Sequence, residues 1–478
     1  MGFFLHQHSS SIIADNRQFF HYNVQNMFQS INAYTGKEEA SFEPLNDTDL
    51  TQKLELSEKV FQQWKSLSFA QRAEYLKKVA AIFRSDKTKL AALITREMGK
   101  PIHESEAEIE KSALVCEYYA ENAETFLKDE NMVSDADESF VAYEPIGTVF
   151  AIMPWNFPFW QVFRFAAPAL MAGNTALLKH ASNVPACGAA IEEVFLKAGL
   201  PDGVFQNLFA DIPQMEAIIS HAAVKAITLT GSERAGKSVA ALAGKYLKKS
   251  VLELGGSDPF IVLADADVDQ ATDVVMKSRI ANAGQTCIAS KRFILEKSIS
   301  AKFTALLIDK ISKVKLGDPM LPETNMGPMV HAKALEQLQE QVDKSVKLGA
   351  KVLYRHTDVP KGNFFPPTVL GQITKEMPAY SEELFGPVIS IFEVGNTEEA
   401  IQLANDTSFG LGASIWTKNT ETGKQIARKI DSGAVFVNGI VKSDPRLPFG
   451  GTKSSGYGRE LGHQGIREFV NQKTIWIK

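Results

Sequence analysis

From residue 146 onward, short apolar runs typical of buried strands alternate with segments that have the periodicity of helices. The first set of strand runs is IGTVFAIMPW, TALLKHA, GVFQNL, VKAITLT and SVLEL. After Gly255 and Gly256 the pattern restarts with PFIVLAD, RFILE, KVLYR, VISIFEV, GASIWT and AVFVNG. Strands that alternate with helices predict parallel sheets with crossover helices, so we expect two α/β domains.

Composition narrows the class of protein. A chain of 478 residues is long enough for two or three domains. The net charge of -5 argues against nucleic acid or an anionic membrane as the main partner, and no apolar run approaches the ~20 residues of a membrane span. Cys116, Cys187 and Cys287 are too few and too scattered for a disulfide framework or a zinc site. A reducing compartment, the cytoplasm, and no bound metal are therefore expected.

The N-terminal segment lacks the basic start and long apolar run of a secretory signal. We expect residues 1–30 to be a flexible extension, and Met27 is an alternative start. Residues 53–128 are rich in helical patterns, which Gly99 and Pro101 interrupt.

Residues 231–238, GSERAGKS, match the sequence motif of a phosphate-binding loop. Read alone it predicts a nucleotide hydrolase with Lys237 on the phosphates, and Asp265 after FIVLA could imitate a magnesium-binding residue. However, Glu233 would put a carboxylate inside the phosphate cradle, which is electrostatically unfavourable.

Four polar residues are candidates for chemistry. Cys287, in the small polar loop NAGQTCIAS, is either a nucleophile or a structural cysteine. Glu253, at a strand end before two glycines, is either a general base or a salt-bridged residue. Asn156, between the prolines of MPWNFPF, is either an oxyanion donor or a turn residue. Lys179, at the end of the next strand, either meets a phosphate or ribose or is a surface lysine.

These motifs in chain order resemble the aldehyde dehydrogenase superfamily. The matching stretches are PWNFP, LLKHAS, LTGSERAG, LELGGSDPFIVL, GQTC, EELFGPV, VFVNG and PFGGTKSSGYGRELG. The resemblance runs from about residue 31 to 478 and is strongest to bacterial succinate-semialdehyde dehydrogenases. It implies a doubly wound NAD(P)-binding domain over 31–124 and 146–252 and an α/β catalytic domain over 253–437. It also implies a small β oligomerisation flap over 125–145 and 460–478, and a homodimer or homotetramer.

The resemblance assigns roles residue by residue. Cys287 would attack the aldehyde, Asn156 and the Cys287 N–H would hold the oxyanion, and Glu253 would activate water. Gly231 and Ser232 would contact the cofactor where a helix begins. A helix N-terminus also favours a pyrophosphate, so this role accounts for the match to the phosphate-loop motif. The residues expected to line the NADP or NAD site are Trp155, Asn156, Lys179, His180, Ala181, Ser182, Gly231, Ser232, Leu254, Glu383 and Phe385.

Arg164 matches, by its spacing from PWNFP, the arginine that binds the carboxylate of succinic semialdehyde, with Ser443 and Arg446 in the matching substrate loop. A second arginine of some relatives is Ala281 here, and Arg279 is displaced by two positions. The product would be succinate; a different or broader aldehyde range is the alternative.

Three further inferences follow from the resemblance. Ser182 replaces a glutamate of NAD-selective relatives, so NADP⁺ should be accepted. Ala289 excludes a local disulfide switch with Cys287. A CoA-acylating enzyme and a catalytically inactive protein on this fold are the alternatives from other classes; Glu253 argues against the first, and the intact trio of Cys287, Glu253 and Asn156 against the second.

Overall fold

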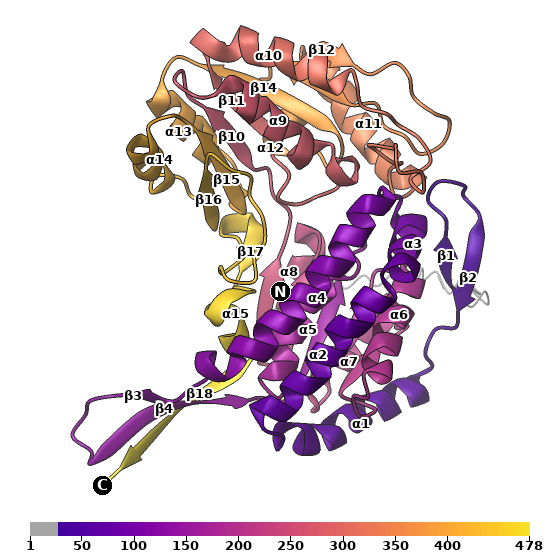
Figure 1. Ribbon diagram of the computed structural model, residues 1–478, viewed down its shortest axis with the longest axis vertical. Helices are drawn as coiled ribbons and strands as arrows, with labels where there is room; N and C mark the ends of the chain where they lie inside the picture. Colours follow the sequence, from indigo (N-terminus) through magenta and orange to yellow (C-terminus); the bar gives the residue numbers. More distant parts are fainter. Residues whose placement is uncertain (1–26) are drawn as a thin grey trace, which may run out of the picture.

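The computed structural model describes residues 27–478, which form two α/β lobes and a projecting β-ribbon (Figure 1). The described chain begins with the antiparallel hairpin of β1 (Phe28–Ile31) and β2 (Glu38–Phe42). Phe28, Gln29 and Ser30, which we had placed in a flexible extension, therefore belong to a paired strand; residues 1–26 lie outside the described part. Four helices follow: α1 (Asp47–Lys65), α2 (Phe69–Ser85), α3 (Lys87–Met98) and α4 (Ile102–Phe126).

The first sheet is formed by the strands predicted between 146 and 254. They are β5 (Thr148–Met153), β6 (Thr175–His180), β7 (Phe205–Asn207), β8 (Val224–Thr230) and β9 (Lys249–Glu253). These five strands are parallel and lie in the order β9-β8-β5-β6-β7, with short β17 (Gly456–Tyr457) antiparallel beside β9. The crossover helices are α5 (Trp160–Met171), α6 (Pro185–Lys197), α7 (Met215–Ser220) and α8 (Glu233–Lys245).

Helices cover both faces of this sheet because successive strand residues point to opposite sides. On β5, Val149 and Ala151 pack into the core formed with α2, α4, α5 and α6. Phe150, between them, packs into a separate core with α1, α7 and α8. The predicted doubly wound sheet is confirmed. Its strand order reverses between β5 and β8, and a ligand crevice forms outside the carboxyl ends of the strands at such a switch point.

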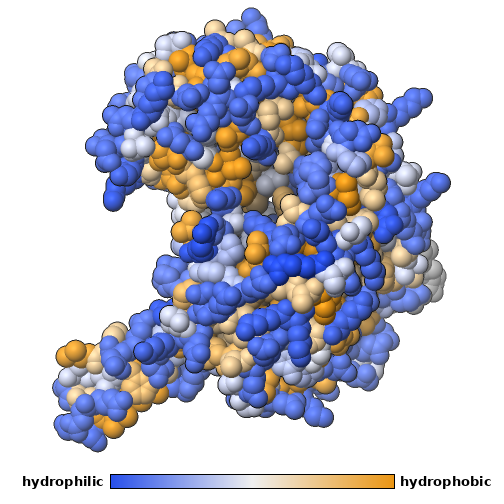
Figure 2. Space-filling view, viewed as in Figure 1, coloured by the Kyte–Doolittle hydropathy of each residue, from blue (hydrophilic) through white to orange (hydrophobic). Residues whose placement is uncertain are grey.

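The second sheet has seven strands in the order β12-β13-β14-β11-β10-β15-β16, and only β12 is antiparallel to its neighbour. Its strands are β10 (Pro259–Val262), β11 (Arg292–Glu296), β12 (Lys351–Arg355), β13 (Thr368–Gly371), β14 (Val388–Val394), β15 (Gly412–Trp416) and β16 (Ala434–Val437). Its helices are α9 (Val268–Arg279), α10 (Lys297–Ile311), α11 (Ala332–Lys347), α12 (Pro378–Ser381), α13 (Thr397–Asn405) and α14 (Thr420–Ala427). Figure 2 shows the molecule hollowed between the two lobes, on the side from which the ribbon projects.

The ribbon is an antiparallel sheet of β3 (Glu130–Asn131), β4 (Glu138–Pro145) and β18 (Val470–Ile477), in the order β18-β4-β3. It extends away from both lobes at the lower left of Figure 1. Between β16 and β18 the chain returns to the first lobe, where β17 pairs with β9 and α15 (Gly462–Arg467) packs on α4 and α5. Helix α15 and the end of α4 therefore lie outside the ribbon itself.

Within residues 27–478, no helix combines the length and apolarity needed to cross a membrane. In the same part of the chain, no group of three His, Cys, Asp or Glu side chains is arranged to hold a metal ion. All three cysteines are unpaired; Cys116 and Cys187 are buried, and Cys287 is partly accessible.

Candidate active site

Cys287 lies where two cavities meet. It follows a tight turn in which Asn282, Ala283 and Gly284 all have positive φ, and it precedes β11. One cavity, of about 260 Å³, extends from Cys287 toward α4 and α5. The other, of about 530 Å³, extends toward the carboxyl ends of β5 and β8. A thiol shared by two cavities is placed to contact two different ligands.

The Cys287 loop is held by a buried lysine that the sequence did not indicate. Lys291 Nζ donates to the carbonyl oxygens of Thr286, Cys287 and Ala289 at 3.0, 2.8 and 3.1 Å, and it lies 3.3 Å from Glu383 Oε1. Burial raises the pKa of the Cys287 thiol to about 11, while the positive charges of Arg164 and Lys291 oppose this shift. The adjacent charges therefore favour the thiolate that nucleophilic attack requires.

Asn156 lies against this loop. Its Nδ2 donates to the Gln285 carbonyl at 3.0 Å, and its Oδ1 has no hydrogen-bond partner. Asn282, which we had not singled out, donates from Nδ2 to the Asn156 carbonyl at 2.9 Å. Asn282 is marked locally by its positive φ, which cannot be read from the sequence, so the sequence did not indicate this contact. The amide of Asn156 is thus held beside the nucleophile loop.

Glu253 lies at the end of β9, and only 2% of its surface is exposed. Neither carboxylate oxygen has a hydrogen-bond partner. Burial raises the pKa of Glu253 well above its usual value, and the nearby Glu460 carboxylate is the second cause of this shift. The positive charges of Arg164 and Arg459 act in the opposite direction and lower the pKa of Glu253. Glu253 does not line either cavity, but its neighbours Leu254 and Gly255 line the larger one. Burial therefore favours the protonated form of Glu253, and the two arginines favour its carboxylate.

The paired glycines after Glu253 permit a close approach. A Cβ on Gly255 would lie 2.4 Å from Glu383 Oε2, and one on Gly256 would lie 2.9 Å from the Cys287 carbonyl oxygen. Gly256 also donates its N–H to Glu383 Oε1 at 3.1 Å. The sequence expectation that these glycines allow a ligand or backbone to come close is confirmed.

Arg164 is almost fully buried on α5, with its guanidinium paired to the Glu460 carboxylate. It also lies 3.3 Å from Thr230 Oγ1 and 4.6 Å from the centre of the Phe449 ring. A buried charge needs a partner, and for Arg164 that partner is Glu460 of the same chain. Arg164 still lines the smaller cavity together with Cys287, so its charge remains within reach of a ligand there.

The smaller cavity includes a second predicted substrate residue, Ser443, and excludes the third, Arg446. Arg446 does not line it; the Arg446 side chain is 72% exposed and is bound bidentately to Asp444. Arg279 is also directed elsewhere, because its guanidinium donates to the carbonyls of Gly284, Leu384 and Val388. The residues that line the cavity are Glu104, Ala107, Glu108, Lys111, Phe157, Trp160, Gln161, Arg164, Ala281, Thr286, Cys287, Ile288, Ser443 and Phe449.

The larger cavity contains most of the residues expected to meet a cofactor. Seven of them line it: Trp155, Asn156, Gly231, Ser232, Leu254, Glu383 and Phe385. Ser232 caps α8, because its hydroxyl accepts the Ala235 N–H at 3.3 Å. The start of α8 therefore faces a crevice into which free helical N–H groups and a positive helix end are directed.

Four other expected cofactor residues, Lys179, His180, Ala181 and Ser182, do not line this cavity but lie where β6 ends beside β5. Ser182 is exposed, and Lys179 Nζ donates to the His180 carbonyl at 3.3 Å. Burial lowers the pKa of His180 to about 4, and its ring bonds the Pro158 carbonyl and the Ala181 N–H. His180 thus faces the interior, where it holds the PWNFP loop.

The phosphate-loop interpretation fails on geometry. Lys237 is 75% exposed and lies 2.5 Å from Glu233 on the surface of α8, so it does not reach over the loop at Gly231. Asp265 belongs to the other lobe, where it accepts from the Thr417 hydroxyl and the Lys418 N–H. The two halves of a nucleotide hydrolase site are therefore not assembled.

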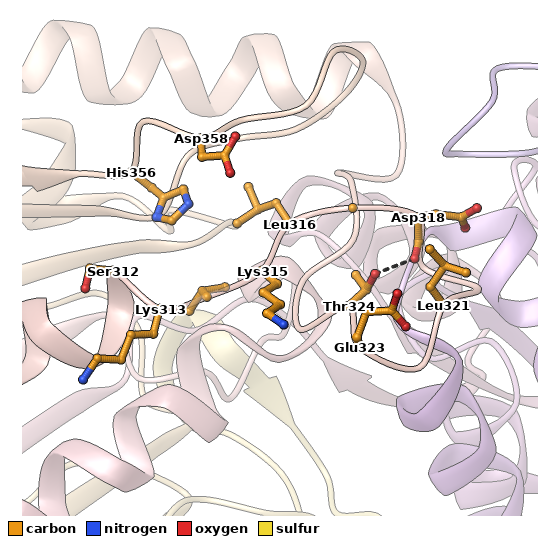
Figure 3. A pocket seen from close by; sticks show the side chains of 12 residues that line it. Ser312, Lys313, Lys315, Leu316, Asp318, Leu321, Glu323, Thr324, His356 and Asp358 are labelled. Carbon is orange, nitrogen blue, oxygen red and sulfur yellow. Dashed lines mark hydrogen bonds between the residues drawn. The ribbon is translucent and has the colours of Figure 1, made fainter.

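Another cavity, of about 520 Å³, lies in the second lobe and shares no residue with the two around Cys287 (Figure 3). Its lining comes from the 312–324 segment and from His356 and Asp358. Figure 3 shows the Thr324 side chain directed toward the backbone of Asp318. The Thr324 hydroxyl donates to the Asp318 carbonyl at 2.6 Å, and this hydrogen bond closes the loop. The cavity is separate from the candidate active site.

A thiol beside the crevice of a doubly wound sheet is the arrangement that a thiol-dependent oxidoreductase with a dinucleotide cofactor requires. Residues 20–475 match the model of the aldehyde dehydrogenase family. The chain belongs to the aldehyde dehydrogenase family.

Similar proteins cover almost the whole chain. A probable succinate-semialdehyde dehydrogenase [NADP(+)] of Synechocystis is 50% identical over 94% of this chain and 99% of its own. Succinate semialdehyde dehydrogenase [NAD(P)+] Sad of Escherichia coli is 44% identical over 94% of this chain and 97% of its own. The succinic semialdehyde dehydrogenase of Streptococcus pyogenes, solved with NADP⁺, superposes with a TM-score of 0.92 at 40% identity, covering 94% of this chain and 99% of its own.

Proposed function

We propose that this protein oxidises succinic semialdehyde to succinate with NADP⁺ or NAD⁺. One observation carries the proposal: Cys287 lines both the cavity at the strand ends and the cavity that holds Arg164 and Ser443. A thiol in that position can bind an aldehyde on one side while a dinucleotide lies on the other. The names of the Synechocystis, Escherichia coli and Streptococcus pyogenes proteins support this substrate and both cofactors.

The residues of the larger cavity fit a nicotinamide dinucleotide. The N-terminus of α8 at Gly231 and Ser232 offers N–H groups for a pyrophosphate, and the Glu383 carboxylate suits ribose hydroxyls. Trp155, Leu254 and Phe385 supply apolar surface for a ring; the Trp155 and Phe385 rings lie edge to face at 5.8 Å. When bound, the nicotinamide supplies the hydride acceptor for the oxidation.

In the first half of the reaction, the Cys287 thiolate adds to the aldehyde carbon and converts the carbonyl oxygen to an oxyanion. Asn156 Nδ2 and the Cys287 N–H are the donors that would stabilise this oxyanion. Asn282 and Lys291 hold these donors in place through the hydrogen bonds to the Asn156 carbonyl and to the 286–289 carbonyls. Loss of hydride from the same carbon leaves a thioester on Cys287.

In the second half, water hydrolyses the thioester and Glu253 accepts the proton of that water. Burial favours the protonated form of Glu253, so Arg164 and Arg459, which lower its pKa, favour the form that acts as a base. Glu253 also supports hydrolysis over transfer to CoA. Carboxylate product and free thiol complete the cycle.

We further propose that the chain functions as a homodimer or homotetramer in the cytoplasm, with a cofactor-binding domain, a catalytic domain and an oligomerisation flap that is limited to β3, β4 and β18. The projecting ribbon supports assembly, because a three-stranded sheet has little core of its own and carries exposed apolar side chains at Met132, Val133 and Trp476. The three unpaired cysteines fit a reducing compartment.

A panel assay tests the proposed reaction. Purified protein would be mixed with succinic semialdehyde, butanal, acetaldehyde and benzaldehyde, with NADP⁺ and NAD⁺ in separate reactions, and reduced cofactor followed at 340 nm. The proposal predicts the highest kcat/KM for succinic semialdehyde and activity with NADP⁺. A higher kcat/KM for an uncharged aldehyde would overturn the substrate, and no NADP⁺ activity would overturn that part of the cofactor proposal.

A further inference from the structure

Lys111 brings a second positive charge into the smaller cavity. It lies on α4, on the side that buries Glu108, Ser112 and Val115, and its partly buried side chain lines the cavity with Arg164 and Cys287. Lys111 Nζ lies 3.9 Å from the centre of the Trp160 ring and 3.0 Å from Ser443 Oγ. This is a lysine held in the interior rather than one extended into solvent.

Ser443 links the two neighbours of Lys111. Its Oγ lies 2.9 Å from Trp160 Nε1, which can only donate. It therefore accepts from both Trp160 and Lys111, and its own hydroxyl hydrogen is left to donate to a third group. An ammonium and a hydroxyl hydrogen at one end of a cavity form a cradle for an anion.

The two cations of the cavity differ in their partners. The charge of Arg164 is matched by the Glu460 carboxylate. Within residues 27–478, no carboxylate lies within ion-pairing distance (4.0 Å) of Lys111 Nζ. Its acidic neighbours are engaged elsewhere: Glu108 pairs with Lys100, and Asp444 with Arg446.

We propose that Lys111, with Ser443, binds the remote carboxylate of the substrate and so determines the preference for an aldehyde that carries a negative charge. This rests on the proposed function, because it assigns the group that recognises that substrate. A partly buried ammonium without a counter-ion is stabilised when a carboxylate binds next to it, and an uncharged chain of the same length gains nothing from it. Arg164, which already pairs with Glu460, adds a weaker and more general attraction.

Lys111→Met tests the assignment, because methionine keeps most of the side-chain length and removes the charge. The measurement is kcat/KM for succinic semialdehyde divided by kcat/KM for butanal, which has the same number of carbons. We expect this specificity ratio to fall at least about tenfold, mainly through a higher KM for succinic semialdehyde. Lys111→Arg should retain a larger part of the ratio than Lys111→Met. Lys78→Met is the matched control, since Lys78 also contacts a ring, that of Tyr75, but lies outside the cavity.

The pH dependence of wild-type enzyme gives a second readout that needs no variant. Burial and the charge of Arg164 lower the pKa of Lys111 to about 7, with Lys442 acting in the same direction and Glu108 and Asp444 opposing it. Lys111 therefore loses its charge as the pH rises above about 7, while the substrate carboxylate stays ionised. Glu104, the other acid in the cavity, has a pKa raised to about 7 by burial and can only add to the fall by gaining negative charge. The specificity ratio should decrease between pH 6 and 9, and Lys111→Met should remove most of this decrease.

The outcomes separate the two proposals. If wild-type enzyme prefers succinic semialdehyde and Lys111→Met keeps that preference, with a melting temperature near that of wild type, the role of Lys111 is overturned and the proposed function stands. If wild-type enzyme shows no preference for the charged aldehyde, the proposed substrate fails as well. If Lys111→Met does not fold, a wild-type ratio that stays constant or rises between pH 6 and 9 overturns the role.

Discussion

A single guanidinium, that of Arg164, acts on three acidic groups of the site. It pairs with Glu460, and it lowers the pKa values of Glu253 and Cys287, both of which burial raises. Burial alone would keep the thiol and the carboxyl protonated and therefore unreactive. The charge of Arg164 counteracts that effect on both the proposed nucleophile and the proposed base. Its buried setting, surrounded by apolar helix residues, was visible in the sequence, but its partner Glu460 was not.

At the residue scale, we expect Glu253→Gln to separate the two halves of the reaction. The amide cannot accept a proton from water, so the thioester should form and then accumulate. Stopped-flow measurement should show a burst of about one reduced cofactor per site, followed by a steady rate at least ~100-fold below wild type. Cys287→Ala is the control and should show no burst. Near-normal turnover by Glu253→Gln would require a different base.

At the element scale, the site is built from strand ends. The carboxyl ends of β5 and β8 are adjacent in the first sheet, so Trp155 and Asn156 after one strand meet Gly231 and Ser232 after the other. The end of β6, next along the sheet, carries Lys179 and Ser182. These two residues follow the strand next to β5 and do not line the cavity. That position suits contact with the adenosine end of a dinucleotide, where the two cofactors differ.

We expect Ser182→Glu to lower kcat/KM for NADP⁺ by about tenfold while largely preserving kcat/KM for NAD⁺. A carboxylate would repel the 2′-phosphate and would offset the attraction of Lys179, and screened charge contacts of this kind are worth about 1 kcal/mol each. Ser182→Gln, similar in size and uncharged, is the control. Equal losses in the Glu and Gln variants would mean that size rather than charge acts at this position.

At the scale of the whole molecule, the far end of the ribbon projects away from the two lobes (Figure 1). β18 pairs with β4 along its whole length, from Val470 opposite Pro145 to Ile477 opposite Glu138, yet Trp476 and Ile477 remain 48% and 45% exposed. Large apolar side chains on a projecting sheet are characteristic of a surface that another subunit covers.

Trp476→Ser with Ile477→Ser should therefore weaken assembly. Sedimentation velocity should show a shift to smaller species, with thermal unfolding of the lobes reported separately by circular dichroism. Ile212→Ser with Leu247→Ser is the control, because these side chains are 81% and 94% exposed on the first lobe and lie outside the sheet that contains β18. If both pairs leave the molecular mass unchanged, the ribbon is not the principal contact between subunits.

The sequence alone determined most of the elements and the chemistry of the site. Periodicity and strand runs are local properties, so the five parallel strands of the first sheet and five of the parallel strands of the second were predicted close to their observed bounds. β13 was missed because its four residues, TVLG, directly follow two prolines and are too short to show a pattern. Residue types in motifs identified Cys287, Glu253 and Asn156, since each chemistry needs its own functional group.

Only the tertiary structure decided which side chains meet. Lys111 contacts Ser443, which is 332 positions later in the sequence. Arg164 on α5 contacts Glu460, which lies in the C-terminal segment where the chain returns to the first lobe. Arg446 and His180 had suitable chemistry, but their partners Asp444 and Pro158 turn them away from the cavities. A local pattern reports the propensity and burial of its own segment. Contacts between distant segments depend on the order of strands in the sheets and on the path of the C-terminal segment, and these follow from packing of the whole chain.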